Sequence, residues 1–267
     1  MQVVILCGGQ GTRLRDVSED MPKPMVPIGD RPILWHIMKS YAEYGFNDFV
    51  LCLGYKSWVI KRYFLEYFLA HSNISVNLGS PQEYELHGSL GEEDWRVTMV
   101  ETGIDSMTGC RVKRIERFIT EDTFHLTYGD GVADVDLSAL VDFHHSHGKI
   151  ATVTAVQPPG RFGEIALNGD QVVNFMEKPV QAPGRISGGF FVLDKRIFSR
   201  LKNDPALVFE QQPMTGLARD GQLHAFRHDG FWHPMDNSRD HKHLNDLWDA
   251  GRAPWKRWGT PRLRIAA

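Results

Sequence analysis

The first residues that could do chemistry form a glycine-rich turn directly after a short apolar segment. Val3–Leu6 is expected to be a buried strand, and Gly8-Gly9-Gln10-Gly11-Thr12-Arg13-Leu14 follows it almost at once. Glycine lets the backbone approach a phosphate chain closely, and successive N–H groups in such a turn can point inward as an anion-binding nest. Arg13 adds a planar, permanently charged guanidinium that suits phosphate oxygens. The turn is therefore predicted to bind phosphates.

Two well-known phosphate loops match this turn less well. A Rossmann dinucleotide loop has the pattern G-x-G-x-x-G, but after Gly9 and Gly11 the third glycine position holds Leu14. A P-loop closes with Gly-Lys-Ser/Thr, which the turn lacks. A plain glycine-rich connection between a strand and a helix is the structural alternative.

A lysine and an aspartate are the next candidates for a site. Lys23 lies between Pro22 and Pro24, and because Pro24 pushes Lys23 toward an extended backbone, a stiff segment aims the ammonium. Asp130 follows a predicted strand over residues 124–128, and open α/β sheets place ligand groups at the carboxyl ends of their strands. The structural alternatives are a solvated loop lysine and a turn aspartate before a glycine.

Other titratable residues are weaker candidates. Asp134 and Asp240 are further carboxylates near these segments, and Asp136 is better explained as a helix cap. His144, His145 and His147 come at the end of a predicted helix without metal-ligand spacing, so they are expected to form a solvated helix end. No Gly-x-Ser-x-Gly elbow indicates a serine nucleophile.

With these motifs in place, the sequence resembles the nucleotidyltransferases that activate sugar 1-phosphates, over nearly the whole chain to about Trp258. Within that family it is most similar to the glucose-1-phosphate cytidylyltransferases, which make CDP-glucose for deoxysugar pathways. The matching runs are residues 8–14, 22–26, 32–39, 106–109, 128–134, 158–163, 177–179, 188–193 and 234–236. The first run and Glu177-Lys178-Pro179 are typical of the superfamily. The runs at 106–109, 158–163 and 231–236 are typical of the cytidylyl branch.

The resemblance implies a role for each matched residue. Nucleotide binding falls to Leu6, Gly8, Gly9, Gln10, Gly11, Thr12, Arg13, Lys23, Ser106, Thr108, Arg111 and Gly129. Sugar-phosphate binding falls to Gly163, Glu177, Lys178, Gly188 and Gly189. The residues implied in catalysis are Arg13 for the pyrophosphate, Lys23 for the α-phosphate, Lys178 for the sugar phosphate, and Asp130 with Asp236 as the ligands of Mg²⁺. A hard cation that keeps several waters needs only one or two carboxylates besides phosphate oxygens.

Base recognition is implied for Ser106, Thr108 and Arg111. Cytosine offers an amino donor beside ring and carbonyl acceptors, so a hydroxyl or backbone acceptor must be paired with a donor such as arginine. A polar loop that runs into an ordinary helix start is the structural alternative.

The implied reaction is transfer of a cytidylyl group from CTP to a sugar 1-phosphate, with glucose 1-phosphate as the expected acceptor and pyrophosphate as the second product. The alternatives are the same chemistry with UTP, dTTP or another sugar 1-phosphate, and a homologue that binds nucleotide without turnover. The resemblance also implies a homo-oligomer.

The elements that must position these residues alternate between strand and helix. Asp30 is expected to cap a helix over residues 31–44 that ends before Gly45, a strand follows at 49–53, and a helix follows at 59–68. Further strands are expected at 74–78, 96–101, 150–157 and 188–193, with two short strands around residues 168–170. A polar loop is expected at 80–94, and helices are expected at 111–119, 136–147, 206–219 and 239–250. This order predicts a mostly parallel, doubly wound, Rossmann-like α/β core with a small antiparallel and C-terminal addition.

Length and composition are consistent with such a core. The 267 residues, 42% of them hydrophobic, suffice for one domain over 1–258, with a nucleotide-binding part at about 1–135, a sugar-phosphate-binding part at about 136–258 and a loosely held tail at 259–267. A net charge of -3 gives no reason to expect a nucleic-acid partner. Three scattered cysteines and the lack of a long apolar run favour a cytoplasmic protein without a membrane partner.

Overall fold

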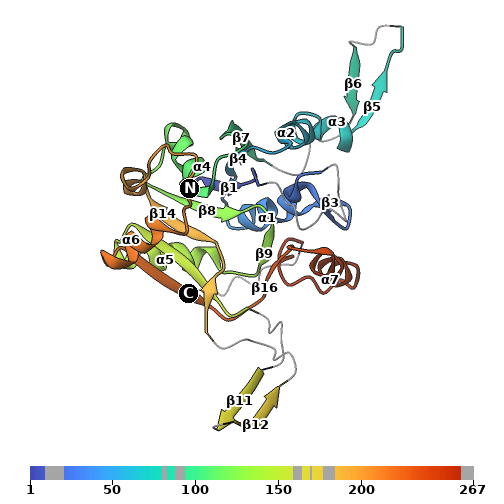
Figure 1. Ribbon diagram of the computed structural model, residues 1–267. Coiled ribbons are helices and arrows are strands. Elements are labelled where there is room, and N and C mark those ends of the chain that lie inside the picture. Colours follow the sequence, from blue (N-terminus) through green and yellow to red (C-terminus); the bar gives the residue numbers. More distant parts are fainter. Residues whose placement is uncertain are drawn as a thin grey trace, which may run out of the picture.

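The chain is built around a mixed β-sheet (Figure 1). The computed structural model describes residues 1–9, 21–79, 83–87, 94–158, 164–168, 170–176 and 184–259, and over these ranges the sheet has eight strands in the order β13-β10-β14-β8-β1-β4-β7, with β15 paired to β10. The strands are β1 (Val3–Leu6), β4 (Asp48–Leu53), β7 (Arg96–Glu101), β8 (Thr123–Tyr128), β10 (Ala151–Val156), β13 (Ile186–Ser187), β14 (Phe191–Asp194) and β15 (Leu223–His228). The run β8-β1-β4-β7 is parallel, whereas β14 is antiparallel to both β8 and β10. The predicted α/β class, with a parallel core and an antiparallel addition, is confirmed.

Helices cover both faces of this sheet. They are α1 (Ile33–Ala42), α2 (Ser57–Leu65), α3 (Tyr67–His71), α4 (Thr108–Arg114), α5 (Leu137–His147), α6 (Gln212–Arg219) and α7 (Ser238–Asp249). Because side chains alternate along a strand, Val3 and Ile5 enter a core that includes Ile37 of α1, whereas Val4 enters a second core that includes Val112 of α4. The two cores explain why β1 and β4, the inner strands of the parallel half, are almost continuously apolar.

The start of α1 differs from the sequence prediction. Pro32, not Asp30, occupies the N-cap position, and no side chain caps the helix. Proline disfavours the helical conformation in the preceding residue, so Arg31 is extended and pairs with Ile28 in a short hairpin of β2 (Pro27–Ile28) and β3 (Arg31–Pro32). The predicted cap of α5 is confirmed, because Asp136 accepts a hydrogen bond from the N–H of Ala139 (3.0 Å) and Gly148 ends the helix in the left-handed region.

Several other predicted boundaries are wrong. The helix expected at 206–219 begins only at Gln212, and the one expected at 111–119 begins at Thr108 and changes after Arg114 to a 3₁₀ turn, Glu116–Phe118. The strand expected at 188–193 is limited to β14, because Gly189 and Phe190 both have positive φ and turn the chain just before it. Inside the expected polar loop, β6 (Tyr84–His87) pairs with β5 (Asn73–Val76).

Two hairpins extend away from the body of the molecule (Figure 1). One is β5–β6, and the other joins β11 (Glu164–Asn168) to β12 (Gln171–Met176), as the turn at residues 168–170 predicts. In contrast, β9 (Gly131–Ala133) and β16 (Trp232–Pro234) form a short ladder inside the body. Among the described residues, no helix is long and apolar enough to cross a membrane.

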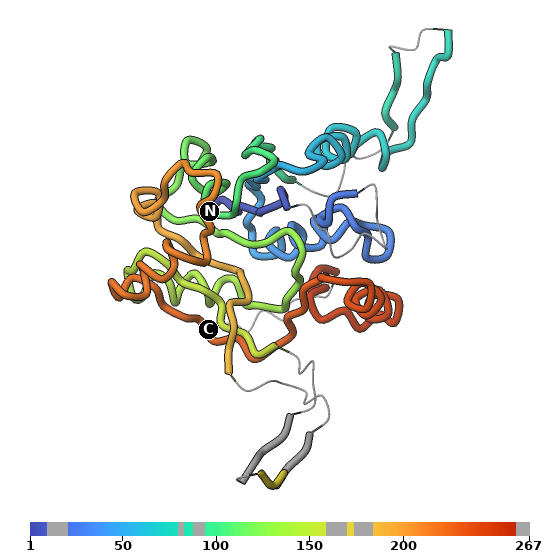
Figure 2. The backbone as a smooth tube through the Cα atoms, in the orientation of Figure 1, coloured from blue at the N-terminus to red at the C-terminus, as the bar shows by residue number. Residues whose placement is uncertain are grey.

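The C-terminal helix returns to the N-terminal part of the chain. Figure 2 shows α7, in red, beside the blue segment that carries β2 and β3. The Asn245 side chain accepts a hydrogen bond from the N–H of Gly29 (2.9 Å), and a His241 ring nitrogen lies 2.9 Å from the carbonyl oxygen of Pro27. This contact brings the segment before α7 close to the loop that carries Lys23.

Candidate active site

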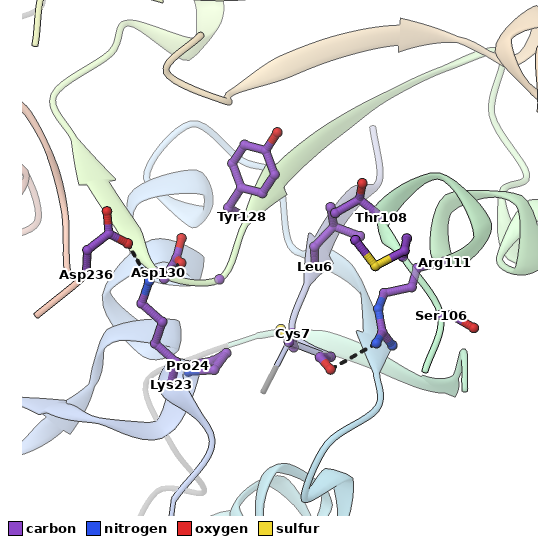
Figure 3. A pocket seen from close by; sticks show the side chains of 14 residues that line it. Leu6, Cys7, Lys23, Pro24, Ser106, Thr108, Arg111, Tyr128, Asp130 and Asp236 are labelled. Atoms are coloured by element: carbon purple, nitrogen blue, oxygen red, sulfur yellow. Dashed lines mark hydrogen bonds and ion pairs between the residues drawn. The ribbon is translucent and has the colours of Figure 1, made fainter. Parts of the chain in front are cut away.

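A cavity of about 350 Å³ lies at the carboxyl ends of β1 and β8 (Figure 3). It is lined by Leu6, Cys7, Gly8, Gly9, Lys23, Pro24, Ser106, Met107, Thr108, Arg111, Tyr128, Gly129, Asp130 and Asp236. This is the edge at which open α/β sheets bind ligands. Every predicted nucleotide or metal residue within the described ranges therefore lies on the wall of one cavity. Gln10, Gly11, Thr12 and Arg13 lie outside the described residues.

One end of the cavity holds a lysine between two carboxylates. The Nζ atom of Lys23 lies 2.6 Å from Asp130 Oδ2 and 2.7 Å from Asp236 Oδ1. Burial lowers the pKa of Lys23, but the attraction and hydrogen bonds of Asp130 and Asp236 outweigh it, so the pKa is raised overall. Lys23 therefore remains a cation across the neutral range.

The backbone holds the two carboxylates side by side. Asp130 lies between β8 and β9, and Asp236 follows β16, the partner of β9. The N–H of Met235 donates to the backbone carbonyl of Asp130 (2.8 Å). This bond holds the two segments together next to the two aspartates. Asp240 supports the second segment by accepting from the N–H of Asp236 (3.0 Å).

The weaker carboxylate candidates have structural roles in this arrangement. Asp134 pairs with His228 at 3.0 Å, Asp136 caps α5, and Asp240 accepts from the loop after β16. None of the three is among the described residues that line the cavity.

Asp130 and Asp236 fit a hard divalent cation in their chemistry. Both are carboxylates, the ligand type that Mg²⁺ prefers, and both already converge on one positive charge, the ammonium of Lys23. In the described part of the chain, no group of three or more His, Cys, Asp or Glu side chains could hold a metal. Two carboxylates suit a metal that completes its coordination with water and phosphate oxygens.

Arg111 is turned into the protein. Its Nη1 atom donates to the carbonyls of Leu53 (3.0 Å) and Gly103 (2.8 Å) and to the Thr102 hydroxyl (2.9 Å). Its Nη2 atom donates to the carbonyls of Gly8 (2.9 Å) and Ile104 (3.3 Å). These bonds join the segments that follow β1, β4 and β7, so the geometry favours a clamp on the glycine turn over the implied contact with the base.

The turn needs glycine for the same reason. A Cβ atom on Gly8 would lie 2.0 Å from Arg111 Nη1, and one on Gly54 would lie 2.5 Å from the same atom. The guanidinium occupies the space that side chains would need.

The other residues implied in base recognition line the opposite side of the cavity from Lys23. The Ser106 hydroxyl accepts from Arg114 Nη1 (2.9 Å). The Thr108 hydroxyl accepts from the N–H of Phe209 (2.9 Å) and donates to Glu210 Oε2 (2.6 Å). Tyr128, which the sequence prediction missed, donates to Glu210 Oε1 (2.6 Å). Its place one residue before Gly129-Asp130 is the signal that could have identified it.

Comparison with known proteins identifies the family. The model of the nucleotidyl transferase family matches residues 2–232. The chain belongs to that family.

Relatives of this nucleotidyltransferase match it over nearly its whole length. It is 49% identical over 259 residues to the glucose-1-phosphate cytidylyltransferase of Salmonella typhimurium, covering 97% of this chain and 100% of that protein. It is 42% identical over 258 residues to the probable glucose-1-phosphate cytidylyltransferase of Bacillus subtilis, with the same coverage of both chains. Among solved structures, HddC from Yersinia pseudotuberculosis matches with a TM-score of 0.67 at 23% identity, over 92% of this chain and 99% of that one. This last likeness concerns the fold.

The sugar side of the nucleotidyltransferase is described only in part. Gly188 and Gly189 are not among the described lining residues. A Cβ atom on Gly189 would lie 2.9 Å from Tyr128 Cδ2, so this glycine packs closely against the Tyr128 ring. Trp232 Nε1 donates to the carbonyl of Gly188 (2.8 Å) and ties this turn to β16. Gly163, Glu177 and Lys178 lie outside the described residues.

The histidines of α5 correct one prediction. His144 is buried, with Nδ1 2.9 Å from the Thr152 hydroxyl, and His147 Nε2 lies 2.8 Å from the same oxygen. The expected solvated helix end is therefore wrong for His144, because α5 packs its last turn onto β10.

Cys7, Cys52 and Cys110 are all buried, and burial raises the pKa of the Cys7 thiol well above its usual range, which disfavours the nucleophilic thiolate.

Proposed function

We propose that the protein transfers a cytidylyl group from CTP to glucose 1-phosphate, giving CDP-glucose and pyrophosphate. The observation that carries the proposal is the 49% identity to a glucose-1-phosphate cytidylyltransferase over 97% of this chain. The charges that line the cavity support the same chemistry, because they provide a cation and two carboxylates at a strand end beside a glycine turn.

The reaction is a single displacement. An oxygen of the sugar phosphate attacks the α-phosphorus, one P–O bond forms, and the bond to pyrophosphate breaks. Since a phosphate oxygen is already ionised near neutral pH, no general base is needed. Positioning of two polyanions and stabilisation of the charge that develops on the leaving group are then the main tasks of the site.

Lys23 carries out the first of these tasks at the α-phosphate. Its ammonium is fixed by a stiff segment and by two carboxylates, so it retains its charge where phosphate oxygens must bind. Arg13 would bind the pyrophosphate and Lys178 the sugar phosphate, as the family resemblance implies. Asp130 and Asp236 would hold Mg²⁺. When bound, that ion neutralises phosphate charge and orients the nucleotide.

The test is pyrophosphate release with CTP, UTP, dTTP and ATP, each against a panel of sugar 1-phosphates. We expect kcat/KM to be highest for CTP with glucose 1-phosphate, with UTP roughly ten- to a hundredfold poorer, the range that one unpaired buried polar group gives. A higher kcat/KM for dTTP or ATP would overturn the base assignment. Binding of nucleotide without any turnover would overturn the enzymatic proposal itself.

A further inference from the structure

Glu210 lies behind two hydroxyls that line the nucleotide cavity. Tyr128 donates its hydroxyl proton to Glu210 Oε1 and Thr108 donates its proton to Glu210 Oε2, both at 2.6 Å. Tyr128 and Thr108 line the cavity, whereas the exposed Glu210 is not among the described lining residues. Tyr128 ends β8 and Thr108 begins α4, and Glu210, in the segment before α6, is 82 positions from the first and 102 from the second.

The carboxylate decides which way these hydroxyls point. A free hydroxyl rotates its proton toward whatever acceptor is near, so it can face a donor or an acceptor equally well. An ionised carboxylate can only accept, so here both protons are directed at Glu210 and away from the cavity. Thr108 is fixed further by the N–H of Phe209 (2.9 Å). The cavity therefore meets two oxygens that can accept hydrogen bonds but not donate them.

Thr108 lies at the end of the cavity away from the phosphate-binding charges. Figure 3 shows Lys23, Asp130 and Asp236 at one end and Leu6, Thr108 and Arg111 at the other, with Tyr128 between them. A nucleotide with its phosphates at the first end places its base toward the second.

We infer that Glu210 is a positioning residue that sets the preference for cytosine over uracil, an inference that rests on the proposed use of CTP. Cytosine presents an amine where uracil presents a carbonyl oxygen, and the adjacent ring nitrogen exchanges acceptor for donor. Hydroxyl oxygens that can only accept bind the amine and leave the uracil oxygen opposite another acceptor. Glu210 thus discriminates without touching the base, because it removes the adaptability of the two groups that touch it.

The test is the ratio of kcat/KM for CTP to kcat/KM for UTP at saturating glucose 1-phosphate, in wild type and in Glu210→Gln. The amide has a donor and an acceptor, so one of the two hydroxyls must turn its proton into the cavity. We expect the ratio to fall about tenfold, through a lower value for CTP and a higher value for UTP. Thr108→Val should lower the CTP value selectively, and Thr108→Ser should restore it.

Matched controls separate this inference from a structural role and from the proposed function. Glu85→Gln changes an exposed carboxylate on the β5–β6 hairpin and should leave the ratio unchanged. An equal loss for both nucleotides in Glu210→Gln, with the wild-type ratio retained, would show that Glu210 only ties three segments together and would overturn the inference. A wild-type enzyme without preference for CTP would instead overturn the base assignment of the proposed function. The midpoint of thermal unfolding of each variant distinguishes misfolding from altered recognition.

Discussion

At the scale of the residue, the three charges of Lys23, Asp130 and Asp236 depend on one another. Two carboxylates that converge on one point repel each other, and the ammonium at 2.6 and 2.7 Å offsets that repulsion. The same ammonium is the group proposed to bind the α-phosphate. Removal of either carboxylate therefore changes both the proposed metal site and the electrostatic support of Lys23.

Asp130→Asn and Asp236→Asn should each lower kcat by about a hundredfold or more, a few kcal/mol of transition-state stabilisation. EDTA should abolish activity and added Mg²⁺ should restore it in the wild type. Pyrophosphate release as a function of Mg²⁺ concentration measures both effects. Full activity of either variant at low Mg²⁺ would contradict the metal assignment.

Arg111→Lys tests the clamp described for this side chain. A lysine cannot replace a guanidinium that bonds five oxygens, and buried carbonyls left unpaired cost about 1–3 kcal/mol. We expect a lower free energy of unfolding and an equal loss of kcat/KM for CTP and UTP, measured by urea denaturation and steady-state kinetics. A changed CTP-to-UTP ratio would instead support a direct contact between Arg111 and the base.

At the scale of the element, the N-cap of α5 is expected to affect the stability of the fold and not catalysis. Asp136 lies outside the cavity and holds the first turn of the helix through the N–H of Ala139. Asp136→Ala should lower the free energy of unfolding by about 1 kcal/mol, the usual cost of losing a cap. The Mg²⁺ dependence of kcat should not change, which makes this variant a control for the two metal-ligand variants. A shift in Mg²⁺ dependence would bring Asp136 back as a candidate ligand.

Elements whose signals are local are the ones that could be predicted from the sequence. The apolar segments of β1, β4 and β8 and the cap of α5 depend on neighbouring residues, and their approximate positions are confirmed. The start of α1 was mistaken because a capping signal at Asp30 competes with the extended backbone that Pro32 imposes on its predecessor. The hairpin β5–β6 was predicted only in part. A strand was expected at 74–78, close to β5, whereas β6 lies in the segment that was expected to be a polar loop.

Within the site, the direction in which a side chain points could not be predicted from the sequence. The sequence places an arginine at position 111, but whether its guanidinium faces a base or the backbone depends on Leu53, Gly8 and Gly103, which arrive from distant segments. Glu210 carried no signal at all, because its partners lie 82 and 102 residues away. Asp236 was found through the family resemblance alone, since 213 residues separate it from Lys23.

At the scale of the whole molecule, buried neutral histidines contribute to the response to acid. Burial lowers the pKa of His36 to about 4 and that of His125 to about 3. The unfolded chain, with ordinary histidines, binds more protons below about pH 6.5, so the free energy of unfolding falls as the pH drops from about 6.5 to 4. His36→Gln should remove about 1.4 kcal/mol per pH unit of this slope. Urea denaturation at several pH values measures it, with the exposed His87→Gln as the control; an unchanged slope in His36→Gln would contradict the assignment.

The projecting hairpin bears on the expected homo-oligomer. Ile74 and Val76 alternate along β5, Tyr84 faces Val76 across the ladder, and all three are exposed. An isolated two-stranded hairpin is marginally stable in water, so a second copy of the chain is expected to cover this face. Analytical ultracentrifugation should give a multiple of the mass of one chain, and Val76→Lys should weaken association. A monomer at micromolar concentration would rule out this expectation.

The pairing of β9 with β16 also has a consequence for biosynthesis. Lys23 reaches one carboxylate 107 positions later and the other 213 positions later, so the charged cluster closes only after nearly the whole chain has been made. A nascent or prematurely terminated chain that stops before Trp232 can form β1, β4 and β8, yet it lacks both the strand that holds the Asp130 segment and Asp236. If Asp130 and Asp236 act as proposed, such a fragment is expected to be inert. Activity would then first arise in chains extended past Asp236.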